Sequence, residues 1–162
     1  MEGLDDATGA PGQGFGAPQL CVRSESMEAL ASSPRPQPAP LRILVVEDDP
    51  ESLQMMGALL AVWGHETILA PAGPPALEAV AQEMPDVVLL DLGLPGMDGY
   101  QVAREIRRTP HGGDTVFIAA VTAYRGEEHE RRAREAGFDR YLTKPVDIDV
   151  LRQTLSQAPR RG

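Results

Sequence analysis

Acidic side chains lie directly after two strongly apolar stretches of the sequence. Glu47, Asp48 and Asp49 follow the stretch LRILVV, and Asp91 ends the stretch DVVLLD. If these residues converge, carboxylates about 5 Å apart repel each other by roughly 3 kcal/mol at an effective dielectric constant of about 20. Converging carboxylates therefore need a cation. Oxygen ligands that leave room for water favour Mg²⁺, which also suits sites that hold phosphate oxygens.

A hydroxyl and an ammonium follow two further stretches of the same kind. Thr122 ends the stretch TVFIAAVT, and Lys144 follows DRYLT. Lys144 is the only lysine among the 15 lysine and arginine residues of the chain. Each of these residue types is commonplace alone, so their occurrence together at the ends of apolar stretches is what indicates a functional site.

The acidic residues divide into candidates for chemistry and candidates for helix capping. Asp91 is followed by the glycine- and proline-rich loop LGLPGMDG, which leaves its carboxylate accessible, so Asp91 is the best candidate nucleophile. Asp49 precedes a proline that suits the first position of a helix, and we expect it to be an N-cap. Asp98 has the same expected role at the end of the loop. Glu47 and Asp48 remain as candidate metal ligands.

Alternating strands and helices must position these residues. Apolar stretches of strand length alternate with stretches of helical period, a pattern typical of strand–helix units on a parallel sheet. In such a sheet, ligands bind outside the carboxyl ends of the strands, where the candidate residues fall. The predicted strands are residues 41–46, 66–70, 86–91, 115–122 and 139–143, and the predicted helices are 50–63, 74–83, 99–108, 127–137 and 147–155.

Composition excludes several classes of protein. The net charge of −9 and the isoelectric point near 4.8 argue against direct nucleic-acid binding. Cys21 is the only cysteine, so an intrachain disulfide and a thiolate metal cluster are both excluded, which fits a cytoplasmic location. We expect no membrane insertion, because no apolar run approaches the roughly 18 residues of a spanning helix. The histidines 65, 111 and 129 are predicted to be solvated surface residues.

The first 40 residues differ in composition and apolar pattern from the rest of the chain. They are rich in proline and glycine and show no period that could bury a face, so we predict a disordered extension over residues 1–40. The predicted domain covers residues 41–157, and residues 158–162 are expected to form a short tail. No output domain is expected.

Four motifs make the chain from Leu41 to about Leu155 resemble the receiver domain of two-component response regulators. They are ILVVEDD (43–49), LLDLGLPGMDGY (89–100), AAVTAY (119–124) and YLTKPVD (141–147). The resemblance implies an α/β, flavodoxin-like (βα)5 fold, which is a doubly wound parallel sheet with strand order 2-1-3-4-5.

The resemblance also implies a phosphoacceptor and a metal site. It makes Asp91 the phosphoacceptor, which takes a phosphoryl group from the phosphohistidine of a sensor or hybrid histidine kinase, or of a histidine phosphotransfer protein. Glu47, Asp48, Asp91 and the backbone carbonyl of Gly93 would hold Mg²⁺. By this resemblance the chain is a signalling phosphoacceptor that catalyses its own phosphorylation and slow dephosphorylation, and not an enzyme with a separate substrate.

A second set of residues would bind the phosphoryl group and respond to it. The resemblance assigns this role to Thr122, the backbone amide of Ala123 and Lys144, with Tyr141 as the switch aromatic residue. It implies a cis bond before Pro145. The ammonium of lysine is compact and its stem is flexible, so Lys144 could contact a carboxylate in one state and a phosphoryl oxygen in the other.

The expected readout is a change of surface over the helix 127–137, the strand 139–143 and the helix 147–155, where a downstream protein would bind. Gly93 has no side chain to exclude water and Tyr124 is bulky, so we expect Tyr124 to set the lifetime of the phosphoryl group. The alternative is a pseudo-receiver, a phosphate-independent interaction module on the same fold.

Overall fold

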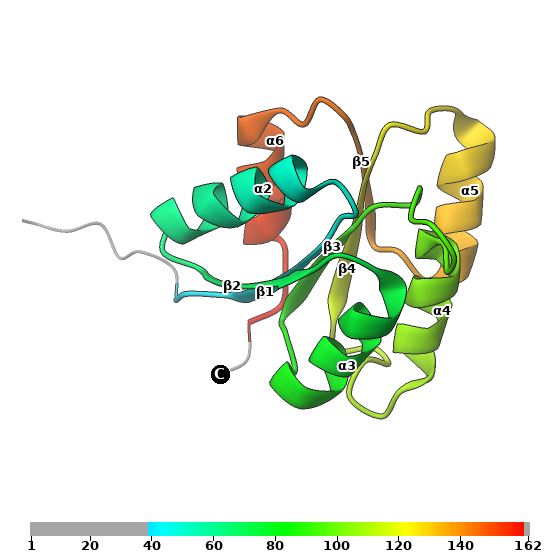
Figure 1. The fold of residues 1–162 in the computed structure, drawn as a ribbon, viewed down its shortest axis with the longest axis horizontal. Coiled ribbons are helices and arrows are strands. Elements are labelled where there is room, and N and C mark those ends of the chain that lie inside the picture. Colours follow the sequence, from blue (N-terminus) through cyan, green and yellow to red (C-terminus); the bar gives the residue numbers. More distant parts are fainter. Residues whose placement is uncertain (1–38, 161–162) are drawn as a thin grey trace, which may run out of the picture. The chain divides into compact units, whose positions relative to one another are not determined.

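The computed structural model describes residues 39–160, so most of the predicted disordered extension lies outside the described residues. Strands and helices alternate throughout the described part (Figure 1). The strands are β1 (Arg42–Val46), β2 (Glu66–Ala70), β3 (Val87–Leu90), β4 (Phe117–Thr122) and β5 (Arg140–Thr143). The helices are α2 (Pro50–Val62), α3 (Gly73–Glu83), α4 (Gly99–Arg108), α5 (Glu127–Ala136) and α6 (Ile148–Ser156).

The strands form one parallel sheet in the order β2-β1-β3-β4-β5, which confirms the predicted fold class. Strands β3 and β4 are buried along their whole length, as expected of central strands covered on both faces. The predicted strand over residues 115–122 is two residues too long at its start, because the regular strand begins at Phe117. No helix in the described part of the chain is long and apolar enough to cross a membrane.

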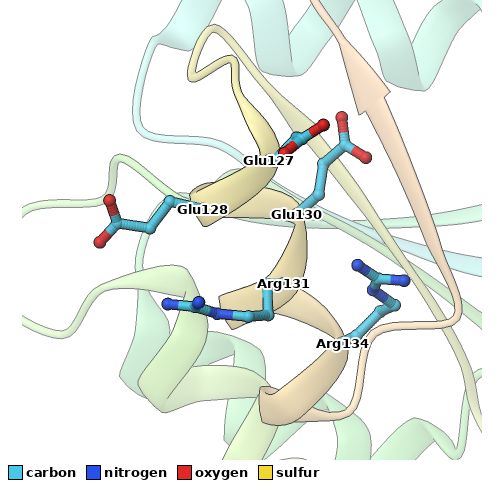
Figure 2. A pocket seen from close by; sticks show the side chains of 5 residues that line it. All are labelled: Glu127, Glu128, Glu130, Arg131 and Arg134. Carbon is cyan, nitrogen blue, oxygen red and sulfur yellow. The ribbon is translucent and has the colours of Figure 1, made fainter.

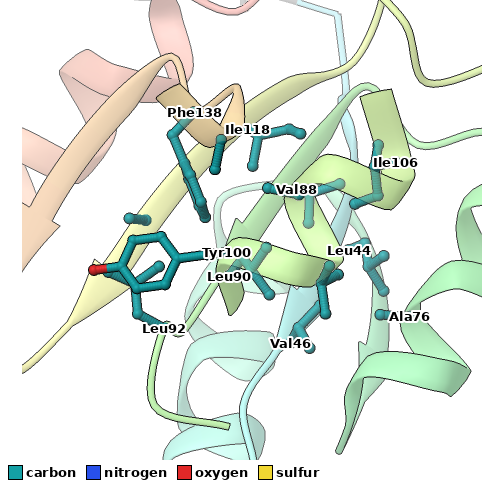
Figure 3. Packing of buried hydrophobic residues seen from close by; sticks show 14 of the residues in the cluster. Leu44, Val46, Ala76, Val88, Leu90, Leu92, Tyr100, Ile106, Ile118 and Phe138 are labelled. Atoms are coloured by element: carbon teal, nitrogen blue, oxygen red, sulfur yellow. The ribbon is translucent and has the colours of Figure 1, made fainter. Parts of the chain in front are cut away.

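Helices cover both faces of the sheet (Figure 1). Alternate strand residues such as Ile43 and Val45 pack with Leu60 of α2 and Leu151 of α6 on one face. The other alternate set packs against α3, α4 and α5, and Figure 3 shows this cluster around Tyr100 and Ile106. The alternation of side chains along each strand thus divides one apolar sequence pattern between two cores.

Aspartates start three of the helices. Asp49 accepts a hydrogen bond from the backbone N–H of Ser52 at 2.9 Å, and Asp147 caps α6 in a similar way. Asp98 and Gln101 form a reciprocal capping box at the start of α4. The structure therefore confirms the predicted N-cap roles of Asp49 and Asp98, and these two carboxylates are engaged by helix backbones.

The Arg107 guanidinium ties the end of α4 to two loops. It donates to three carbonyl oxygens of the 109–116 segment and to the Gly137 carbonyl after α5. It also pairs with Asp139 at 2.8 Å, and the same Asp139 oxygen accepts the N–H of Ile118 in β4. The side chain is only 21% exposed. One cation therefore donates to carbonyl groups of two loops that lie outside the regular helices and strands.

We expect Arg107→Ala to lower the free energy of unfolding by about 3 kcal/mol, because it removes charge-assisted hydrogen bonds to partly buried acceptors. Urea unfolding measures this difference. Arg108→Ala is the matched control, since the Arg108 side chain is 71% exposed and forms an ion pair with Glu105 one turn earlier. A loss in Arg107→Ala no larger than that of the control would contradict the structural role of Arg107.

Candidate functional site

Strand register brings the predicted acidic residues together. Val46 of β1 pairs with Leu90 of β3, so Glu47 and Asp91 leave neighbouring strands side by side. Oxygen atoms of Glu47, Asp48 and Asp91 all lie within 4.8 Å of one another. Glu47 and Asp91 are only 7% and 9% exposed, whereas Asp48 is exposed. The carboxyl edge of the sheet thus carries a compact acidic cluster that opens to solvent on the Asp48 side.

Lys144, the residue after β5, reaches the same cluster. Its ammonium contacts Glu47 Oε2, and it lies 3.3 Å from Asp91 Oδ2. Burial alone would lower the pKa of Lys144, but the hydrogen bond with Glu47 and the charge of Asp91 outweigh burial and raise it. Lys144 is therefore protonated at neutral pH and lies between two carboxylates.

The acidic cluster holds three carboxylates and one ammonium, and both burial and crowding disfavour a charge on Glu47. Burial raises the pKa of Glu47, and the nearby charge of Asp91 acts in the same direction, while the hydrogen bonds from Lys144 and from the Asp49 N–H oppose the rise. The geometry offers carboxylate oxygens from three residues, one of them exposed. This donor set fits a hard divalent cation such as Mg²⁺, which keeps part of its water shell.

The loop after β3 orients Asp91. The backbone N–H of Gly93 donates to Asp91 Oδ1 at 3.1 Å, so one carboxylate oxygen faces Gly93 and the other faces Lys144. The loop then returns to the strand end at Gly99, where a Cβ atom would lie 2.4 Å from the Asp91 carbonyl oxygen. Only glycine fits this close approach. Gly99 thus starts α4 directly against the backbone of the acceptor candidate.

The predicted switch residues surround the next strand ends. Thr122 is 1% exposed, and its hydroxyl oxygen accepts the backbone N–H of Tyr124 at 3.2 Å. The Tyr141 hydroxyl donates to the Tyr124 carbonyl at 2.7 Å. Burial is the main cause that raises the pKa of Tyr141 to about 12, so its hydroxyl remains a donor at neutral pH. Ala123 lies between Thr122 and Tyr124 in the chain and is exposed. Its amide was predicted to bind a phosphoryl oxygen.

The end of β5 is fixed by backbone contacts. The Lys144 N–H donates to the Thr122 carbonyl at 2.8 Å, and the Lys144–Pro145 bond is cis. Arg125 Nη2 donates to the Lys144 carbonyl at 3.0 Å. The backbone of Lys144 is therefore joined to the end of β4, where the Thr122 hydroxyl lies.

Two of the three histidines differ from the expected solvated surface. His65 is half-buried, and its Nδ1 accepts the backbone N–H of Leu41 at 3.1 Å. His129 Nδ1 lies 2.9 Å from Tyr100 Oη, and its ring packs against Tyr124. His111 is exposed, as predicted. The Tyr100–His129 contact joins residues 29 positions apart, and no local sequence pattern indicates it.

Comparisons with known proteins agree with this geometry. Residues 43–156 match the response regulator receiver domain family. The chain is 38% identical over 115 residues to a 14.6 kDa protein of Leptolyngbya boryana, and the alignment covers 70% of this chain and 87% of that protein. It is 38% identical over 120 residues to the transcriptional regulatory protein KdpE of Mycobacterium tuberculosis, which covers 74% of this chain and 51% of KdpE. The chain thus spans about half the length of KdpE.

One similar solved structure contains a metal ion in its active site. The receiver domain of the sensor histidine kinase PA1611 from Pseudomonas aeruginosa has a TM-score of 0.68 and 32% identity, over 74% of this chain and 98% of that domain. That domain holds a magnesium ion coordinated in its active site cleft. The strand order, the acidic cluster at the carboxyl edge and the match over residues 43–156 lead to one assignment. The chain belongs to the response regulator receiver domain family.

Proposed function

We propose that this chain is the phosphoacceptor receiver of a two-component phosphorelay. In this proposal, Asp91 takes a phosphoryl group from the phosphohistidine of a histidine kinase or of a histidine phosphotransfer protein. The observation that carries the proposal is the meeting of Glu47, Asp48 and Asp91 with Lys144 at one sheet edge. The magnesium ion in the PA1611 receiver supports Mg²⁺ as the cation.

The proposed transfer depends on positioning and on neutralisation of charge. Asp91 attacks phosphorus in line, an oxygen–phosphorus bond forms, and the nitrogen–phosphorus bond breaks with its electron pair returning to the histidine. Lys144 neutralises charge on the equatorial oxygens from one side. When bound by Glu47, Asp48 and Asp91, Mg²⁺ would neutralise charge from the other side. The chain then promotes its own modification and does not turn over a separate substrate.

The proposed response begins at the buried Thr122 hydroxyl. The acyl phosphate adds negative charge and acceptor oxygens beside Lys144, so a hydrogen bond from Thr122 becomes favourable. Tyr141, now bonded to the carbonyl of Tyr124, would rotate inward as Thr122 moves. Phosphorylation acts here as a shift between two packings of one fold.

The surface that would change covers α5, β5 and α6, where a downstream protein would bind. A hollow along α5 is lined by charged side chains, and Figure 2 shows Glu128 and Arg131 directed to one side of the helix. Glu130 and Arg134 lie toward the other side. Ile148 at the start of α6 is 52% exposed. The surface therefore offers a partner both charged and apolar contacts.

The test is incubation with a small acyl phosphate donor, with and without Mg²⁺, followed by intact-mass measurement and mapping of the modified residue. We expect one phosphoryl group per chain, present only with Mg²⁺ and located on Asp91. A chain that stays unmodified under these conditions would contradict the proposal and leave the pseudo-receiver as the better description.

A further inference from the structure

A chain of aromatic contacts runs from α4 through α5 to the loop beside Asp91. Tyr100 Oη lies 2.9 Å from His129 Nδ1, and the rings of His129 and Tyr124 have centroids 5.0 Å apart. A Cβ atom placed on Gly93 would lie 3.3 Å from Tyr124 Oη and 3.8 Å from Asp91 Oδ1. The Tyr124 hydroxyl thus lies over Gly93, beside the carboxylate that would carry the phosphoryl group.

The backbone of Tyr124 is fixed separately from its ring. Its N–H donates to Thr122 Oγ1 at 3.2 Å, and its carbonyl accepts the Tyr141 hydroxyl at 2.7 Å. Neither bond restrains the side-chain torsions, and Tyr124 is 43% exposed. The contact with His129 is therefore a restraint on where the Tyr124 ring lies relative to Asp91.

His129 can restrain the ring because it is held in turn by a rigid partner. Tyr100 is 3% exposed, and Figure 3 shows its ring within the apolar cluster with the hydroxyl at the cluster edge. The guanidinium of Arg132 lies 4.3 Å from the centre of the Tyr100 ring. A tyrosine locked in this way offers a fixed hydroxyl to His129, whose imidazole then has one preferred orientation.

We infer that His129, held by Tyr100, is a positioning residue that keeps the Tyr124 ring over the phosphorylated Asp91 and slows hydrolysis. The inference rests on the proposed function. In hydrolysis, a water oxygen bonds to phosphorus while the phosphorus–oxygen bond to Asp91 breaks, and the electron pair returns to the carboxylate. One water proton stays on the released phosphate and the other passes to solvent. A fixed ring beside the acceptor narrows the approach of that water.

The test compares phosphoryl decay in His129→Phe and Tyr100→Phe. Each variant keeps an aromatic ring in place but removes the Tyr100–His129 hydrogen bond. After phosphorylation with a small acyl phosphate and removal of the donor, decay is followed by intact mass. We expect each variant to lose phosphate about fivefold faster than wild type, the factor that corresponds to one ordinary hydrogen bond. The double variant should be no faster than either single one.

A Tyr124→Ala background separates positioning from a general structural effect. Without the Tyr124 ring there is nothing for His129 to position, so adding His129→Phe should leave decay unchanged there. Glu135→Ala is the control on the same helix, since its side chain is 67% exposed and forms an ion pair with Arg131. This control should decay as wild type does.

The outcomes distinguish this inference from the function on which it rests. Wild-type chain that takes up no phosphoryl group would overturn both. Normal uptake with wild-type decay in His129→Phe and Tyr100→Phe would overturn the positioning role alone. The same would follow if His129→Phe accelerated decay equally with and without the Tyr124 ring.

Discussion

Asp91→Asn should abolish phosphorylation of this chain by a small acyl phosphate in the presence of Mg²⁺. An amide oxygen cannot form the acyl phosphate, and no other carboxylate in the described part of the chain has the same contacts. One oxygen of Asp91 faces the Gly93 N–H and the other faces Lys144. The asparagine is nearly isosteric and can keep the bond from Gly93. We therefore expect a folded protein with no gain of phosphoryl mass.

Asp98→Asn provides the matched control for Asp91→Asn. It makes the same substitution within the same loop, and asparagine caps helices about as well as aspartate. The capping bond to Gln101 should therefore survive, and phosphorylation should equal that of wild type. Treatment with hydroxylamine, which cleaves acyl phosphates, should remove the phosphoryl group from both wild type and Asp98→Asn. Wild-type uptake by Asp91→Asn would place the acceptor on another residue.

The site could be predicted from the sequence because its residues lie at or just after the ends of predicted strands. Parallel strands bring their carboxyl ends to one edge, so Glu47 and Asp91 had to be neighbours once their strands were adjacent. The caps Asp49 and Asp98 were predictable for a related reason, since capping is decided within a few residues. Both predictions depend on local pattern and on one rule of topology.

The contacts that sequence reasoning missed depend on how helices pack against each other. Arg107 lies at the end of a predicted helix, and nothing in the local sequence indicates that it binds carbonyl groups of two loops. Tyr100 and His129 meet because α4 and α5 lie side by side on one face of the sheet. No sequence period or spacing predicts either contact, because each depends on how side chains of separate elements pack together.

The single lysine is the second residue for which we expect a large effect. The Lys144 ammonium contacts Glu47 and lies 3.3 Å from Asp91, so it is in place before any phosphoryl group arrives. Lys144→Ala removes the cation that would neutralise charge on the equatorial oxygens. Removal of one such preorganised donor typically lowers a reaction rate by about 10²-fold to 10³-fold. We expect a loss of roughly this size in the rate of phosphorylation.

Lys144→Arg tests whether charge alone is sufficient. Arginine keeps the positive charge, but its planar fork suits two carboxylate oxygens and does not follow a single phosphoryl oxygen as a lysine stem can. We expect near-normal folding but a weakened response to beryllofluoride, measured as hydrogen exchange over α5, β5 and α6. Arg140→Lys at the start of β5 is the control, because its guanidinium bonds to Gln157 and to the Asp139 carbonyl. A full response in Lys144→Arg would show that any cation serves, and would remove the special role assigned to this lysine.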